Sequence, residues 1–231
     1  MQSNKRNARI AGFLYLIVVL TGIFSLAYVP SKINVTGDAA PTVGNLIAHE
    51  SLFRLGIVAG LACYTAFLVL PLALYRLLSP FGKDAATLMV AFAAASVPFS
   101  FAMTLGKFEV LALLSGADHL HAFSAQELQA RVMLALQSYR DGVLVAQIFW
   151  GLWLLPFGYL VYRSGILPRT LGVLLMLGCF GYLIDFIGKM LFPAYPESGA
   201  AAFVRLPASL GEIGICLWLL VMGARESSRQ K

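Results

Sequence analysis

The chain has 231 residues, of which 59% are hydrophobic and only 12% are charged, and its formal net charge at pH 7 is +6. Soluble domains carry about 25% charged residues, and a soluble protein of this length could not bury so much apolar side chain. The composition therefore predicts an integral membrane protein. The basic residues lie in short segments between apolar runs, so nucleic-acid binding is not expected.

Six apolar segments predict an all-α fold of six transmembrane helices, at residues 10–29, 52–78, 85–114, 142–161, 171–192 and 207–222. About 20 apolar residues, at 1.5 Å per residue, cross a hydrocarbon core of about 30 Å. The third segment is longer than a straight crossing needs, so we expect it to tilt or project. The whole chain, residues 1–231, is predicted to form one membrane domain.

The first apolar segment has two interpretations. Lys5 and Arg6 precede it, and Ser25 and Ala27 have the small-residue spacing of a signal-peptidase site. The segment is long, however, and the rest of the chain is itself apolar, so we expect a retained first helix. Detection of an intact amino terminus by mass spectrometry would decide between the two.

Two polar segments on the predicted outer side contain shorter helices. Residues 30–51 form a polar loop with a short helix after Pro41. Ser124 and Glu127 form a capping box, and Leu128, Val132 and Leu136 recur every four residues. We predict an amphipathic outer helix at about 124–139, which lies on the membrane surface or leads into the next span.

The distribution of charge predicts the orientation. If both termini are cytoplasmic, the inner side holds two acidic residues, Asp84 and Glu226, against a larger basic set. That basic set comprises Lys5, Arg6, Arg9, Arg76, Lys83, Arg163, Arg169, Arg225, Arg229 and Lys231. This asymmetry follows the positive-inside rule.

Spans two and three resemble spans four and five. The matched positions are Arg54 with Arg140, Gly56 with Gly142, Pro71 with Pro156, Tyr75-Arg76 with Tyr162-Arg163, Thr87-Leu88 with Thr170-Leu171, and Gly106-Lys107 with Gly188-Lys189. The pattern suggests a parallel repeat of helical hairpins. Chance similarity between leucine-rich helices is the alternative.

The fifth apolar segment contains Asp185 and Lys189. Four residues apart on a helix, their side chains share one face and can pair. A charge at the centre of a bilayer costs roughly 2.5–3.5 kcal/mol on insertion scales, so such residues are candidates for function.

Other charges lie in the outer halves of the predicted spans. Together they suggest a polar pocket open to the outer side, with Asp185 at its floor. Lys107 and Glu109 are two residues apart, so at most one of them need face this pocket. The candidate ligand-binding residues are Asp185, Lys189, Glu212, Arg54, Arg140, Arg205, Lys107 and Glu109. Alternatively, these charges form ion pairs that fix the register of the helices, with terminal arginines reaching the lipid headgroups.

No catalytic or metal-binding motif is present in the sequence. The three cysteines, Cys63, Cys179 and Cys216, lie in apolar runs without CxxC spacing, so we expect small buried side chains. His49, His119 and His121 lie in polar segments and are expected to be solvated. Ser96, Ser100 and Ser209 lack a histidine at a matching depth, so packing roles are expected. We predict no cofactor.

Several motifs are similar to those of a known family. They are residues 8–16 (ARIAGFLYL), 52–58 (LFRLGIV), 74–78 (LYRLL), 158–169 (GYLVYRSGILPR) and 181–185 (GYLID). With them the chain resembles, over nearly its whole length, the bacterial membrane-protein family called domain of unknown function 4386. The resemblance implies a six-span inner-membrane protein without an assigned activity.

The charges lead to a functional hypothesis. We expect the protein to bind a small anionic or amphiphilic ligand in the outer pocket, as a binding protein or a carrier. The basic side chains would hold the anionic group, and Asp185 and Glu212 would orient it or transfer protons. One alternative is a membrane-embedded enzyme acting on a lipid, and another is a structural or sensory partner of a second membrane protein.

Overall fold

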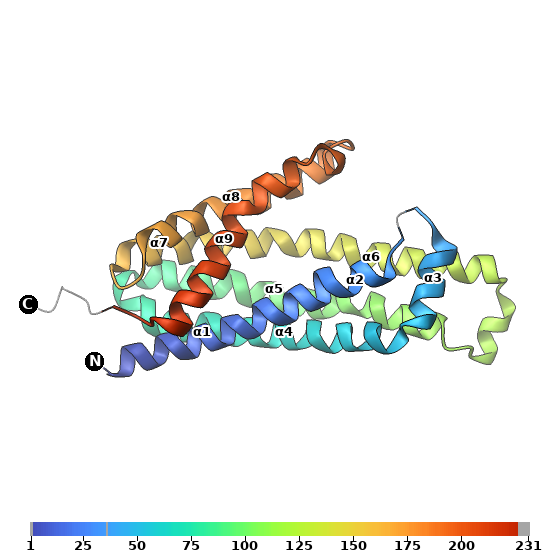
Figure 1. The fold of residues 1–231 in the computed structure, drawn as a ribbon, viewed down its shortest axis with the longest axis horizontal. Helices are drawn as coiled ribbons and strands as arrows, with labels where there is room; N and C mark the ends of the chain where they lie inside the picture. Colours follow the sequence, from blue (N-terminus) through green and yellow to red (C-terminus); the bar gives the residue numbers. More distant parts are fainter. Residues whose placement is uncertain (1, 36, 226–231) are drawn as a thin grey trace, which may run out of the picture.

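A computed structural model describes residues 2–35 and 37–225, and within these ranges the chain is helical apart from short connections (Figure 1). Six helical segments in this part of the chain are long and apolar enough to cross a membrane. They are Asn4–Ile33, Glu50–Phe81, Lys83–Leu113, Ala125–Ser164, Arg169–Leu191 and Ala200–Val221. The predicted all-α, multi-pass membrane fold is therefore confirmed.

The first span has three helical parts and is longer than predicted. It consists of α1 (Gln2–Ile23), the π-helix η1 (Phe24–Tyr28) and α2 (Val29–Ile33). Pro30 has no N–H to donate to the carbonyl of Leu26, and the π-helical turn directly before it accommodates this missing bond. The span therefore continues past residue 29, where the apolar run was expected to end.

The second and third spans are α4 (Glu50–Leu78) and α5 (Lys83–Leu113), joined by the 3₁₀ turn η2 (Ser79–Phe81). Both continue through an internal proline, Pro71 in α4 and Pro98 in α5. The predicted loop at 30–51 is largely helical, because α3 (Ala39–Ala48) begins before Pro41. The side chain of Asp38 caps α3 by accepting a hydrogen bond from the N–H of Ala40 at 3.2 Å.

The fourth span begins with the predicted capping box and is interrupted near a proline. Ser124 and Glu127 cap α6 (Ala125–Leu152), in which the amphipathic segment and the apolar segment form one uninterrupted helix. The helix breaks at Trp153 and resumes as α7 (Leu154–Ser164). Pro156 cannot donate a hydrogen bond to the carbonyl of Leu152, which explains the position of the break.

The last two spans are α8 (Arg169–Leu191) and α9 (Ala200–Val221), and Figure 1 shows both inclined to the other helices. The 3₁₀ turn η4 (Pro196–Ser198) lies between them, and η3 (Asp118–Ala122) connects α5 to α6. After α9, Gly223 packs near the backbone of Lys5, and the N–H of Arg225 donates to the carbonyl of Ile166 at 2.9 Å. The start of α1 and the end of α9 therefore lie at the same end of the bundle.

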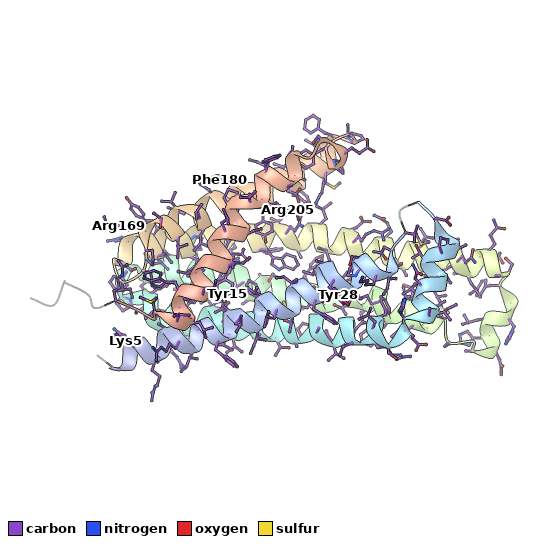
Figure 2. All side chains as sticks on the ribbon, in the orientation of Figure 1. Lys5, Tyr15, Tyr28, Arg169, Phe180 and Arg205 are labelled. Carbon is purple, nitrogen blue, oxygen red and sulfur yellow. The ribbon has the colours of Figure 1, made fainter. Side chains whose placement is uncertain are left out.

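Aromatic side chains fill the centre of the bundle. The ring centroid of Trp153 lies 5.0 Å from that of Phe67 and 5.1 Å from that of Phe157. Large apolar side chains also cover the outer surface: Leu105 is 65% exposed, and Phe180, on the outer face of α8 in Figure 2, is 53% exposed. Such a surface suits a lipid environment rather than water.

Small polar side chains within the spans are bonded to their own helices or buried. Ser100 donates to the carbonyl of Ser96 at 2.9 Å, and Thr104 donates to that of Ser100 at 2.8 Å. The three cysteines are buried and form no disulfide with one another. The predicted burial of the cysteines is confirmed, and Ser96 and Ser100 are buried as well.

Candidate functional site

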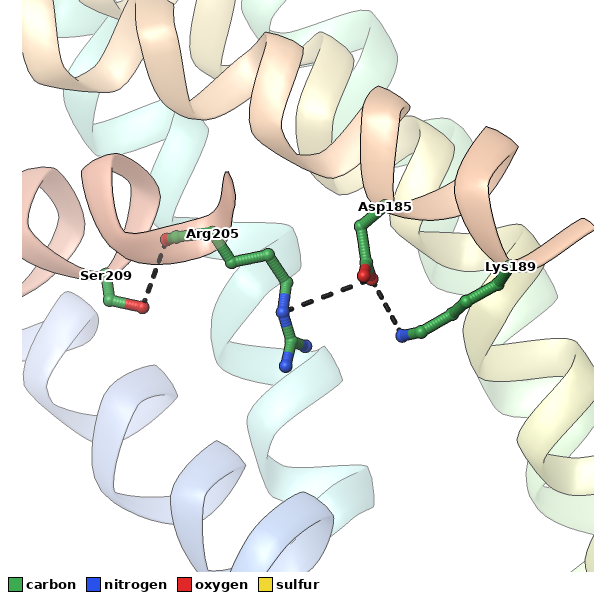
Figure 3. A network of polar contacts seen from close by, with 4 residues as sticks. All are labelled: Asp185, Lys189, Arg205 and Ser209. Atoms are coloured by element: carbon green, nitrogen blue, oxygen red, sulfur yellow. Dashed lines mark hydrogen bonds and ion pairs between the residues drawn. The ribbon is translucent and has the colours of Figure 1, made fainter. Parts of the chain in front are cut away.

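An ion cluster joins α8 to α9. The carboxylate of Asp185 is fully buried, and its Oδ2 accepts a hydrogen bond from Lys189 Nζ at 2.7 Å, one helical turn away (Figure 3). Arg205 Nε on α9 lies 4.0 Å from the same oxygen, which is an ion-pair distance but too long for a hydrogen bond. One carboxylate thus faces two cations.

Glycines bring the two helices close enough for this cluster to form. A Cβ atom at Gly181 would lie 2.3 Å from the carbonyl oxygen of Val204, and one at Gly178 would lie 2.8 Å from Cα of Ala208. Asp185 is one turn beyond Gly181, and Arg205 directly follows Val204. The close backbone contact therefore places the carboxylate opposite the guanidinium.

Some buried polar atoms in and near the cluster have no hydrogen-bond partner among the described residues. Among the described residues, Asp185 Oδ1 and Arg205 Nε are buried without a hydrogen-bond partner, as is the hydroxyl of Tyr195. Tyr195 lies in the connection after α8, and its ring packs against Gly188. Desolvation, followed by the negative charge of Asp185, raises the pKa of its phenol.

A basic cavity with a volume of about 730 Å³ adjoins the cluster, bounded by α2, α4, α5, α6, α8 and α9. The basic residues in its wall are Lys107, Arg140, Lys189 and Arg205, whereas Asp141 is the acidic residue. Gln147 also lines the wall, and its Oε1 is buried without a partner among the described residues. The wall is therefore suited to an anionic group.

Lys107 stands out among the basic side chains of this cavity. It is 4% exposed, and its Nζ lies 4.1 Å from the centroid of the Tyr139 ring. No carboxylate lies within ion-pair distance of this ammonium group in the part of the chain that the structure describes. A buried ammonium group balanced only by an aromatic face is costly in a membrane and available to an anion.

A second, mainly apolar cavity of about 550 Å³ lies between α1, η1, α4, α6 and α9. Both cavities have Leu26, Trp150, Tyr182 and Arg205 in their walls, so they adjoin each other. The rest of this wall is largely aliphatic and aromatic, with Glu212 as its acidic residue. Glu212 is half-buried and lies two turns after Arg205 on α9.

The structure brings together six of the eight predicted site residues. Asp185, Lys189 and Arg205 form the ion cluster. The basic cavity is lined by Lys107, Arg140, Lys189 and Arg205, and the apolar cavity by Glu212. Asp185 itself lines neither cavity, so it is not the predicted floor. It lies behind the wall and holds two basic side chains that do face the cavity.

Arg54 and Glu109 do not belong to this arrangement. Arg54 is exposed and pairs with Glu50 at 2.6 Å, one turn earlier on α4. Glu109 is also exposed, and neither residue lines the two cavities. Of the pair Lys107 and Glu109, only the lysine faces inward, as their two-residue spacing on a helix requires.

Sequence reasoning missed the aromatic and amide members of the walls. No sequence pattern identified Tyr139, Gln147, Trp150 and Tyr182 as wall residues. Tyr182 could have been found, because it lies three residues before Asp185 and therefore on nearly the same helix face. For the other residues the sequence has no comparable signal.

The histidines lie apart from these cavities. His49, His119 and His121 are exposed, in line with the expected solvated positions. Within residues 2–35 and 37–225, no three His, Cys, Asp or Glu side chains are close enough together to hold a metal ion.

Comparison with protein families finds a match over most of the chain. The family model described as domain of unknown function (DUF4386) matches residues 10–223. The chain belongs to the DUF4386 family. The family resemblance predicted from the sequence motifs is thereby confirmed.

The DUF4386 chain is also similar to a curated relative, an uncharacterized protein from Archaeoglobus fulgidus. The two are 35% identical over 80 residues, which is 35% of this chain and 45% of the relative. The chain thus covers less than half of that relative's length. Relatives were expected among bacteria, and this one is archaeal. No solved structure is significantly similar to the chain.

Proposed function

We propose that this DUF4386 protein binds a small anionic ligand in the basic cavity between α5, α6, α8 and α9. The observation that carries the proposal is the positive charge of the wall, which contains four basic side chains and one acidic side chain. The proposal places the protein in a bacterial inner membrane, with this cavity toward the outer side. A carrier would use the same site during transport.

Lys107 provides the sharpest test. Replacing its buried ammonium by an uncharged amide in Lys107→Gln removes one charge-assisted contact. Since such contacts contribute about 1.5–3 kcal/mol, we expect anion binding to weaken by roughly 10- to 100-fold. Protein in nanodiscs of zwitterionic lipid would be titrated with inorganic phosphate, glycerol 3-phosphate and dodecyl phosphate. Dodecyl maltoside is the uncharged comparison probe.

Arg54→Gln is the matched control, because it removes a basic side chain that lines neither cavity and pairs with Glu50. It should bind every probe as the wild type does. The proposal is wrong if no anionic probe binds above the level of empty nanodiscs, or if Lys107→Gln binds as tightly as the wild type.

A further inference from the structure

The adjoining cavities differ in the charges of their walls, and this difference bears on the ligand class. Both walls contain many aliphatic and aromatic side chains, but one carries Lys107, Arg140, Lys189 and Arg205 with a single acidic residue, whereas the charged residues of the other are Arg205 and Glu212. Their volumes, about 730 and 550 Å³, each lie in the range of pockets for small molecules. An anion alone would fill only the first of them.

We infer that the ligand is an anionic amphiphile, with its headgroup in the basic cavity and its apolar tail in the cavity between α1, α4 and α9. This inference rests on the proposed function and deepens it. The tail would pass the residues shared by both walls, where Trp150 and Tyr182 offer aromatic faces and Arg205 marks the border. Apolar burial then adds to the ionic attraction of the headgroup.

Arg205 is well placed to contact the headgroup. Its guanidinium is 4.0 Å from Asp185 Oδ2, and its side chain remains 43% exposed. In Figure 3 the guanidinium group extends beyond the ion pair, away from the helix that carries Asp185. Asp185 can therefore hold Nε while the terminal nitrogens remain available to a phosphate or carboxylate oxygen.

Glu212 orients the ligand. It lines the apolar cavity, and no basic side chain pairs with it among the described residues. A carboxyl group in this position offers an anionic headgroup no positive charge, whereas the basic wall offers several. The headgroup is thereby directed to the basic side, and the tail takes the remaining space.

The cavity wall offers a substitution that blocks the tail alone. Ala27 on η1 lines the apolar cavity but not the basic one. In Ala27→Trp, a large ring would occupy space that the tail needs and leave the basic wall unchanged. Ala91→Trp on α5 is the matched control, since Ala91 is exposed and lines neither cavity.

The experiment compares inorganic phosphate with butyl, octyl and dodecyl phosphate, in nanodiscs of zwitterionic lipid. Partition of a probe into the bilayer is the same for the wild type and the variant. It therefore cancels in the ratio of wild-type to variant affinity at each chain length. For Ala27→Trp we expect this ratio to rise with chain length, to at least tenfold for dodecyl phosphate, because each buried methylene contributes about fourfold. Inorganic phosphate should bind both proteins equally, and Ala91→Trp should match the wild type throughout.

Two outcomes would overturn the inference. One is inorganic phosphate binding to the wild type as tightly as dodecyl phosphate does, and the other is a ratio for Ala27→Trp that does not change with chain length. In either case a loss of phosphate binding in Lys107→Gln would still support the basic cavity as an anion site. Failure of every anionic probe would reject both the inference and the proposed function.

Discussion

Asp185 stabilises the junction of α8 and α9 through one carboxylate oxygen. Lys189 and Arg205 both approach Oδ2, and the carboxylate is fully buried. Removing one member of a buried ion pair leaves the remaining charge uncompensated, whereas removing both members costs less. The role of Asp185 is therefore to position two basic side chains at the cavity wall, in addition to any effect on the ligand.

We predict that Asp185→Ala lowers the free energy of unfolding by about 3 kcal/mol, because it leaves two neighbouring cations without their shared partner. The double variant Asp185→Asn, Lys189→Gln should lose less than the sum of its single variants. Thermal unfolding of the purified protein in nanodiscs measures both effects. Additive losses would show that Asp185 and Lys189 are not coupled.

At the scale of helices, glycines and prolines determine where the site residues lie. Gly178 and Gly181 allow α8 to contact the backbone of α9, and Pro156 fixes the break between α6 and α7. The π-helix η1, just before Pro30, places Leu26 and Ala27 in the walls of the cavities. These backbone features bring together charges from four different spans.

Gly181→Ala tests the helix contact. Its new Cβ would meet the carbonyl oxygen of Val204 at 2.3 Å, so α8 and α9 must separate, and we expect a loss of about 1–3 kcal/mol in unfolding free energy. Gly44→Ala in α3 is the control, because nothing lies within 4 Å of its Cβ and the substitution should stabilise the helix by up to about 1 kcal/mol. Equal melting temperatures for the two variants would contradict this account.

At the scale of the whole molecule, the chain is a six-span bundle. The start of the first span and the end of the last span lie at the same end of this bundle. The contact of Gly223 with the backbone of Lys5 establishes this arrangement. The side of the membrane on which these ends lie, and the repeat of helical hairpins, remain predictions. The excess of basic residues at this end favours the cytoplasm.

Labelling of single cysteines would test the orientation. In a variant with Cys63, Cys179 and Cys216 replaced by alanine, we expect His119→Cys to react with an impermeant maleimide in intact cells. Lys83→Cys should react only after the cells are permeabilised, because it lies in the turn at the predicted cytoplasmic end. The opposite pattern would reverse the orientation and move the proposed site to the cytoplasmic half.

The sequence by itself determined the fold class, the six spans, the family and the Asp185–Lys189 pair. The length of an apolar segment and an i, i+4 spacing of charges are local properties, so the sequence of a single helix is enough to recognise them. Glu50 and Arg54 have the same i, i+4 spacing, so their pair is a local feature too. Sequence alone could not show that Arg205 joins Asp185 and Lys189, because Arg205 lies on another span and its approach depends on which helices touch.

Only the tertiary structure decided which side chains line a common cavity. Lys107 faces inward and Glu109 outward because of the rotation of α5 against α6, which the nearly uniform apolar composition of α5 does not specify. Asp185 lies behind the wall rather than in it, because close glycine contacts bury its carboxylate between α8 and α9. A cavity is shaped by several helices at once, so its wall emerges only when their packing is known.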